Sequence, residues 1–377
     1  SMSAKQHFMS VYDALMSTPP FLRLAAWTEN SQWHRESSIY EHTRMVVAEY
    51  VNLVGDREWT MADFLGGIAC VFHDLGKPDR AHKGATGKYS FHGHEQRSME
   101  LFLEHPTAQQ MTKRSRMIVA WMIQHHLPFG TAAHAKLAQF GRWMTACGDG
   151  VFQRVLLADQ LGRLSDTKDE NLMNVQTWMT SKLNTATDRV TDVDLTAYAT
   201  LTDMAALFRD VGNQAQKKHP LLILPIGPSG SGKSTLFNRC LSDNPDVMQF
   251  SWDELRLTMY GGTYEEAFAK YVVDEEAFNE RAGALFKELV SSRRDVYVDN
   301  TNLDGVRFHG YVDTALNFGY DIIYVVFDAP IATLLERQNT RTDKTVPPSS
   351  IYKQAYLHST WMPYKPSQVL FTKSEGS

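Results

Sequence analysis

The sequence has few cysteines and no long apolar run. Cys70, Cys147 and Cys240 are odd in number, widely spaced and set in apolar or helical contexts, which argues against a disulfide framework and favours reduced, buried thiols. No run approaches the roughly 20 apolar residues that a membrane-spanning helix needs. The first residues do not pair a basic region with an apolar stretch. We therefore expect a cytoplasmic protein with no membrane partner.

The chain also lacks a strong excess of charge of either sign, internal repeats and low-complexity tracts. Its formal net charge is -5, with 43% hydrophobic and 21% charged residues, which is ordinary for a globular protein. A nucleic-acid partner would have to bind a local basic surface, because the overall charge gives no attraction. The length of 377 residues exceeds what one core usually organises, so we expect a multi-domain chain.

The spacing of apolar residues divides the chain into three parts. Residues 1–165 show helical spacing with little strand-like alternation, which predicts an all-α domain. Residues 166–219 are polar, contain one plausible amphipathic helix around Leu195 to Val211, and are predicted to form a connector. Residues 220–377 alternate short apolar runs with helical segments, which predicts an α/β domain with a parallel sheet. The expected strands are Leu221–Ile226, Val247–Ser251, Val296–Asp299 and Ile322–Phe327.

A glycine-rich loop follows the first expected strand and opens a helix. In such a loop backbone N–H groups cradle phosphate oxygens, Lys233 reaches the outer phosphates and the Ser234 hydroxyl ligates Mg²⁺. The position between a strand and a helix favours a phosphate-binding loop over a chance match, and predicts ATP or another nucleoside triphosphate with Mg²⁺. The expected binding residues are Gly227, Ser229, Gly230, Ser231, Gly232, Lys233, Ser234 and Thr235.

Polar residues after the later strands are predicted to face this loop. Asp253 follows the second strand, at the sheet edge where an acceptor would bind, and can take a proton from an acceptor hydroxyl. Arg256, one helical turn on, can hold an acceptor phosphate. The segment Asp299 to Asn302 ends the third strand and fits Mg²⁺ or its waters. Arg337 and Arg341 offer guanidinium groups for a mobile lid. A helix cap and surface charges are the plainer alternatives for these residues.

Histidines and carboxylates in the first domain form an ordered set that predicts a metal site. Val151, Val155 and Asp159 share one helix face, so Asp159 projects among buried neighbours and needs a partner for its charge. A divalent cation held also by imidazoles would offset the cost of burying it. Such donors suit Mn, Fe, Co, Ni or Cu better than Ca. The set consists of Glu41-His42, His73-Asp74, His94-Glu95, His125-His126 and Asp159.

This pattern resembles that of the HD-domain metal-dependent phosphohydrolases over roughly residues 35 to 165. The residues that carry the resemblance are His42, His73, Asp74 and Asp159, together with Phe91-His-Gly-His-Glu95 and His125-His126. The resemblance implies that the first four hold one metal and that Asp74 bridges to a second metal held by His94 and His125. Whether His125 or His126 is the ligand stays open. A regulatory domain that keeps the fold without turnover is the alternative.

Nearby basic residues could contact a substrate phosphate in such a site. They are Lys77, His82, Lys88 and His92, and we expect each to be a solvated loop residue.

Residues 220 to 350 resemble the phage-type polynucleotide 5′-kinases. The resemblance implies that Asp253 is the general base, that Arg256 contacts the acceptor phosphate, and that Arg337 and Arg341 are lid arginines acting with Lys233. The family's usual Asp-Asp pair appears here as Asp253-Glu254. An HD domain ahead of such a kinase is similar to the bacterial and phage bifunctional RNA end-healing enzymes.

That resemblance implies phosphorylation of 5′-hydroxyl ends of RNA or DNA from ATP, and removal of 2′,3′-cyclic phosphate or 3′-phosphate. No Lys-x-Asp-Gly motif occurs, so sealing would fall to a separate RNA ligase. Two other functions stay open. One is a nucleoside or nucleotide kinase fused to an HD nucleotidase, which a closed acceptor pocket would favour. The other is an RNA-binding module switched by ATP, which a failure to release phosphate would favour.

Overall fold

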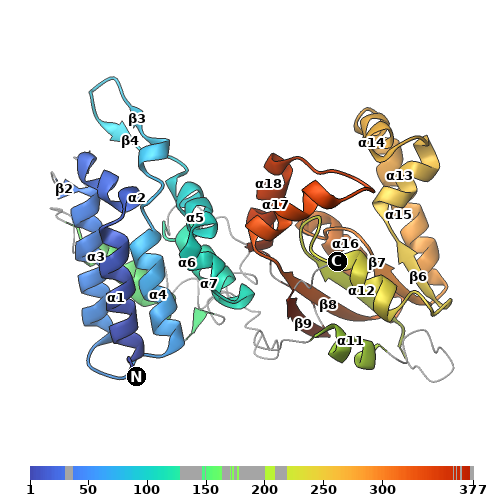
Figure 1. Cartoon of the computed structure of the whole chain (residues 1–377), viewed down its shortest axis with the longest axis horizontal. Helices are drawn as coiled ribbons and strands as arrows, with labels where there is room; N and C mark the ends of the chain where they lie inside the picture. Colours follow the sequence, from blue (N-terminus) through green and yellow to red (C-terminus); the bar gives the residue numbers. More distant parts are fainter. Residues whose placement is uncertain are drawn as a thin grey trace. The chain divides into compact units, whose positions relative to one another are not determined.

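The chain divides into two compact units, Ser1–Thr191 and Asp192–Ser377 (Figure 1). The division falls inside the predicted connector 166–219, most of which lies outside the described residues. The computed structural model describes residues 1–29, 37–127, 147, 148, 150–163, 170, 172, 173, 176, 177, 200–208, 219–359, 361, 363–365 and 367–373.

The first unit is built of helices, as its apolar spacing predicts. The helices are α1 (Ala4–Met16), α2 (Pro19–Leu22), η1 (Arg23–Ala26), α3 (Ile39–Val54), α4 (Met61–Phe72), η2 (Pro78–Arg80), α5 (His94–Glu104), α6 (Pro106–Gln109), α7 (Lys113–Gln124) and α9 (Val151–Leu161). Two antiparallel ladders interrupt them, β1 (Thr28–Glu29) with β2 (Ser37–Ser38) and β3 (His82–Lys83) with β4 (Tyr89–Ser90). The expected helical character of this region is confirmed, and these ladders of two residues per strand are additions to it. The second forms because Gly87, at a positive φ of 81°, closes a tight turn.

Helix α4 packs against α1, α3, α7 and α9 and is the centre of this unit. It begins at a capping box, in which Thr60 and Asp63 bond each other's backbone. Two glycines let its neighbours approach closely, since a Cβ at Gly66 would lie 2.3 Å from the Tyr50 hydroxyl oxygen. The helix ends at Phe72, and the next two residues are His73 and Asp74. The tightest packing in the unit therefore fixes where these two side chains begin.

The second unit contains a five-stranded parallel sheet in the order β6-β7-β5-β8-β9. The strands are β5 (Leu221–Ile226), β6 (Val247–Phe250), β7 (Asp295–Val298), β8 (Asp321–Asp328) and β9 (Gln368–Lys373). The expectation of four strands in a parallel sheet is confirmed, and β9 is a fifth. The helices are α11 (Leu201–Leu207), α12 (Lys233–Cys240), α13 (Trp252–Tyr260), α14 (Tyr264–Val272), α15 (Glu275–Ser291), α16 (Gly305–Asn317), α17 (Ile331–Thr340) and α18 (Pro348–Ser359).

Helix α11 comes from the predicted connector yet belongs to the core of the second unit. Leu201, Met204 and Phe208 are buried in one cluster with Ile223 of β5 and Leu236 of α12. Only the middle of the helix expected around Leu195 to Val211 lies in the described residues. The core of the second unit therefore draws on residues before the expected domain start at residue 220.

All three cysteines are free, Cys70 and Cys147 buried and Cys240 partly so. Among the residues that the structure describes, no helix combines the length and the apolar character needed to cross a membrane.

Candidate functional site

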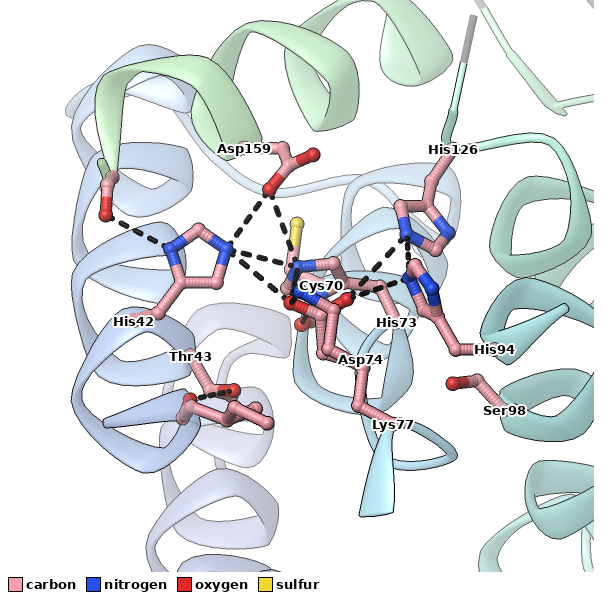
Figure 2. Close-up of polar contacts among 12 residues, drawn as sticks. His42, Thr43, Cys70, His73, Asp74, Lys77, His94, Ser98, His126 and Asp159 are labelled. Carbon is pink, nitrogen blue, oxygen red and sulfur yellow. Dashed lines mark hydrogen bonds and ion pairs between the residues drawn. The ribbon is translucent and has the colours of Figure 1, made fainter. Parts of the chain in front are cut away.

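Six histidine and aspartate side chains meet inside the first unit, and each is at least nine-tenths buried (Figure 2). They come from five helices or helix ends that are far apart in sequence. These residues are His42 of α3, His73 and Asp74 after α4, His94 at the start of α5, His126 after α7, and Asp159 of α9.

The first group joins His42, His73 and Asp159. The His42 Nε2 atom lies 3.0 Å from Asp159 Oδ1 and 3.4 Å from His73 Nε2. The same Asp159 oxygen lies 3.3 Å from His73 Nε2. Gly162 allows α9 to approach α3 this closely, because a Cβ there would lie 2.7 Å from a Val46 methyl group. Three donor atoms therefore face one another within reach of one ion.

The second group joins Asp74, His94 and His126. Asp74 Oδ1 lies 3.1 Å from His94 Nε2 and 3.5 Å from His126 Nε2, and the two nitrogens are 3.1 Å apart. The other Asp74 oxygen, Oδ2, faces the first group, 3.0 Å from His73 Nε2 and 3.4 Å from His42 Nε2. Figure 2 shows the Asp74 carboxylate between the two groups. One carboxylate therefore serves both.

The far nitrogen of each imidazole, Nδ1, donates to a main-chain carbonyl. These bonds run from His42 to Gly162 (3.0 Å), from His73 to Cys70 (2.6 Å), from His94 to Phe91 (2.9 Å) and from His126 to Ile123 (2.6 Å). A carbonyl only accepts, so Nδ1 carries the proton and a neutral ring turns a lone pair on Nε2 toward its neighbours. Two such lone pairs 3.1 Å apart repel each other unless a cation lies between them. The donor set and its outer hydrogen bonds therefore fit a divalent metal.

The predicted ligand His125 belongs to neither donor group, and His126, which the sequence left open as the alternative, belongs to the second. His125 ends α7, donates from Nδ1 to the Trp121 carbonyl at 2.9 Å and stacks on the Trp121 ring at 4.7 Å. Burial lowers the pKa of His125 to about 4. The next residue, His126, lies beside His94 and Asp74.

Two positively charged side chains, Arg163 and Lys77, lie beside the carboxylates of this cluster. Arg163 Nη2 lies 3.1 Å from Asp159 Oδ2, which leaves Oδ1 to face the histidines. Burial alone would raise the pKa of Asp159, but Arg163 and the histidines hold it well below its usual range. Lys77 Nζ lies 3.4 Å from Asp74 Oδ2 and contacts Glu29. The expectation of a solvated Lys77 is therefore wrong, whereas His82, Lys88 and His92 are exposed as expected.

In the second unit the glycine-rich loop joins β5 to α12 as predicted. Gly230 and Gly232 take positive φ values of 90° and 108°, which favour glycine. Lys233 is buried and donates to the carbonyls of Gly227 and Pro228, both at 2.8 Å. Burial lowers the pKa of Lys233 to about 7. The lysine thus lies over the loop, with main-chain oxygens in the place that phosphate oxygens would take.

The Ser234 hydroxyl, at the start of α12, donates to Asp299 Oδ2 at 3.3 Å. Asp299 follows β7 and also accepts from Gln249 at 2.9 Å. Hydroxyl and carboxylate oxygens at this edge suit Mg²⁺ or its waters. Asn302, expected at the same edge, instead donates to the carbonyls of Pro225 and Val298. Its amide nitrogen therefore supports the backbone at the edge of the cleft that Asn302 helps to line.

Side chains of the predicted lid segment, which runs from Glu336 near the end of α17 to Pro347, contact the loop directly. Arg337 Nη1 donates to the Gly230 carbonyl and Arg341 Nη1 donates to the Ser229 hydroxyl, both at 2.7 Å. The Ser229 N–H, one of the donors expected to bind phosphate, donates to Gln354 Oε1 of α18 at 2.9 Å. The lid therefore lies on the loop, with its two predicted arginines in contact with it.

Asp253 and Arg256 lie on α13 at the other side of the loop. Arg256 Nη1 donates to Asp253 Oδ1 at 2.9 Å, and Lys344 of the lid pairs with Asp253 Oδ2. The Arg256 guanidinium lies against the rings of Tyr271 and Phe268, 4.4 and 5.1 Å from their centres. Its Nε is buried without a hydrogen-bond partner. Lys344 was missed at the sequence level, although it stands in the lid segment three residues after Arg341.

One cleft of about 860 Å³ collects these side chains. The loop residues from Ser229 to Thr235, Ser231 excepted, form one wall, and the acceptor-side and lid residues form the others. Among the lining residues are Asp253, Arg256, Asp299, Arg337, Arg341 and Lys344.

Residues 222–356 match a family model described as an AAA domain. The matched segment contains the phosphate loop, Asp253, Asp299 and the lid, and it makes the C-terminal unit a kinase-like P-loop domain, which takes ATP with Mg²⁺. The match does not extend to the N-terminal unit.

A solved structure of the Pnkp1/Rnl/Hen1 RNA repair complex contains a chain that is 27% identical to this one. The match covers 39% of this chain and 47% of that chain, with a TM-score of 0.32. The match therefore spans about half the length of that protein.

Proposed function

We propose that the protein prepares both ends of a broken polynucleotide. Its C-terminal unit phosphorylates a 5′-hydroxyl end from ATP, and its N-terminal unit, an HD-type phosphohydrolase domain over residues 1–165, removes a 2′,3′-cyclic phosphate or a 3′-phosphate. The observation that carries the proposal is that each unit gathers, within itself, a set of groups suited to a phosphorus centre. Metal-ion donors meet in one unit, and loop amides, arginines and a carboxylate meet in the other.

The kinase reaction follows from the order of groups along the C-terminal cleft. Asp253 lies across the cleft from the loop, so its carboxylate can take the proton of a 5′-hydroxyl. The hydroxyl oxygen then forms a bond to the γ-phosphorus while the bond to the β-phosphate oxygen breaks and ADP leaves. Lys233, Arg337 and Arg341 neutralise charge on the transferring group, and Arg256 holds the phosphate next to the acceptor hydroxyl.

The hydrolytic site is supported by the four converging Nε2 atoms and the two carboxylates. When bound there, one or two divalent ions (Mn, Fe, Co, Ni or Cu) would lower the pKa of a water and neutralise phosphate charge. The ligands would be His42, His73, Asp74 and Asp159 for one ion, with Asp74, His94 and His126 for the other. Main-chain carbonyls orient the imidazoles, and Lys77 places a positive charge beside Asp74 that can receive a substrate phosphate oxygen.

The two proposed activities belong together chemically. Cleavage of RNA through its 2′-hydroxyl leaves a 2′,3′-cyclic phosphate and a 5′-hydroxyl, and a conventional ligase seals neither. A chain with both activities converts both ends, and a separate RNA ligase would then join them.

The test uses an oligonucleotide with a 5′-hydroxyl and a 2′,3′-cyclic phosphate, incubated with radiolabelled ATP and a panel of divalent metals. Two variants separate the sites. We expect Asp253→Asn to lower 5′ labelling by about 10² to 10⁴-fold, the usual worth of a general base, while 3′ processing is unchanged. We expect Asp74→Asn to lower 3′ processing at least about 100-fold while 5′ labelling is unchanged.

Both asparagine variants keep the size of the side chain, and circular dichroism checks that each folds. A nucleoside acceptor that is phosphorylated while the oligonucleotide is not would favour the small-molecule kinase. Retained RNA binding with no phosphate release under any metal would favour the ATP-switched binding module. Loss of both activities in either variant would contradict two independent sites.

A further inference from the structure

Arg307 of α16 lies in the same cleft but has no part in the groups assigned above. Its guanidinium carbon lies 4.2 Å from the centre of the Trp252 ring, and 39% of the side chain is exposed. The nearest carboxylate oxygens, from Glu275 and Asp304, are 3.6 and 3.8 Å away, which is too far for a hydrogen bond. Stacking thus holds the guanidinium in place while its N–H groups stay available to a ligand.

Trp252 forms a fixed platform between two arginines. Its backbone N–H donates to Asn300 Oδ1 and its indole N–H donates to the Tyr311 hydroxyl, both at 2.9 Å. The Arg256 guanidinium carbon lies 5.5 Å from the Trp252 ring and that of Arg307 lies 4.2 Å from it. Both guanidinium groups thus lie against the same ring, which is itself almost fully buried.

The two arginines differ in their relation to the expected acceptor hydroxyl. Arg256 is hydrogen-bonded to Asp253, so it lies where the phosphate nearest the acceptor hydroxyl is expected. Arg307 lies against the same Trp252 ring, and its ion pairs are with Glu275 and Asp304 rather than Asp253. A single strand carries one phosphate for every nucleotide. A strand whose first phosphate lies on Arg256 therefore brings its second phosphate towards Arg307. A guanidinium fork matches a phosphate in shape and charge.

We propose that Arg307 binds the second phosphate of the acceptor strand, so that the cleft selects a polynucleotide over a single nucleotide. This inference rests on the proposed kinase function of the C-terminal unit, and it names a residue that would set the choice between a polynucleotide and a single nucleotide. A nucleoside 3′-monophosphate reaches only Arg256. A dinucleotide 3′-phosphate or a longer strand reaches both arginines.

The test compares the 5′ phosphorylation of a nucleoside 3′-monophosphate, a dinucleotide 3′-phosphate and a longer oligonucleotide. We expect Arg307→Ala to raise the KM for the last two about tenfold, the size of one charge-assisted hydrogen bond in a partly exposed site, with kcat and the mononucleotide KM unchanged. The slope of log KM against log salt for the oligonucleotide should fall by about 0.7, as for the loss of one phosphate contact on a single strand. Arg307→Lys should restore part of the loss.

Arg281→Ala is the matched control, because Arg281 is exposed on α15 and does not line the cleft. Equal effects of Arg307→Ala on all three acceptors, or none on the longer two, would overturn the inference and leave the kinase standing. A wild-type enzyme that phosphorylates no acceptor would overturn the kinase function instead. Oligonucleotide binding, followed by fluorescence anisotropy, would then decide on Arg307: weaker binding in Arg307→Ala than in Arg281→Ala supports it, and equal binding overturns it.

Discussion

The two candidate sites are built in opposite ways. In the N-terminal unit the six clustered side chains are at most 8% exposed, and main-chain carbonyls hold every imidazole. In the C-terminal cleft the Asp253 side chain is 35% exposed, and lid side chains hold it and the loop. Helix packing therefore sets the first geometry before any ligand arrives. The second depends on where the lid lies, so it can respond to a ligand.

The largest expected effect is on 3′ processing, and it distinguishes His126 from its neighbour His125 in the N-terminal unit. His126→Ala should lower 3′ processing at least about 100-fold, since it removes a proposed ligand that no neighbour can replace. His125→Phe keeps a ring stacked on Trp121 and should leave the rate unchanged. Metal content, measured on the purified variants by inductively coupled plasma mass spectrometry, checks the cause. A loss in His125→Phe with normal turnover in His126→Ala would restore the original assignment of His125.

The next effect concerns Lys233 in the cleft of the C-terminal unit. Burial lowers the pKa of Lys233 to about 7, whereas a bound triphosphate would favour its charged form. Below pH 7 the lysine is already charged, so the affinity for ATP is at its highest. As pH rises above 7 each binding event must take up a proton, so ATP affinity should fall by up to about tenfold per pH unit.

Calorimetry in buffers of different ionisation enthalpy measures that proton uptake directly. The Lys233→Met variant binds ATP more weakly and should show no proton uptake by this group. Affinity that stays level from pH 7 to 9 in the wild-type protein would contradict the shifted pKa.

The smallest effect tests whether the lid belongs to the site. Lys344→Gln removes the positive charge paired with Asp253 and should lower kcat for 5′ phosphorylation about tenfold, the order of one hydrogen bond to a charged group. Lys344→Arg should recover most of the loss because the charge returns. Nearby Lys353 of α18 is outside the cleft lining, so Lys353→Gln serves as the control. Equal losses in the glutamine variants of Lys344 and Lys353 would argue against a specific role for Lys344.

Periodicity and motif order were enough to predict the helical unit, four strands and the loop, because each is a local pattern. They were not enough for β9, whose buried residues Val369 to Phe371 stand between polar neighbours and pair with β8 across a long connection. They also could not separate His125 from His126. The side chains of two adjacent residues at a helix end differ only in the direction in which they point, and that direction depends on how α7 packs.

The two basic side chains beside the metal-ligand cluster, Arg163 and Lys77, could have been predicted from helical spacing. Arg163 follows Asp159 by one helical turn, and Lys77 follows Asp74 by three residues, so each spacing already brings the charges together. What no spacing reveals is that Lys77 is buried against Glu29, which comes from a separate ladder. The contacts of Arg337, Arg341 and Lys344 with the loop and with Asp253 could not be predicted either, because they join segments that are far apart in the sequence.

The shared carboxylate of Asp74 limits how the N-terminal cluster can be altered. Rotating the group to improve its contact with His94 and His126 also swings its second oxygen relative to His42 and His73. The two halves are thus tied through Asp74, and only changes at the imidazoles or at Asp159 can weaken one half while sparing the other.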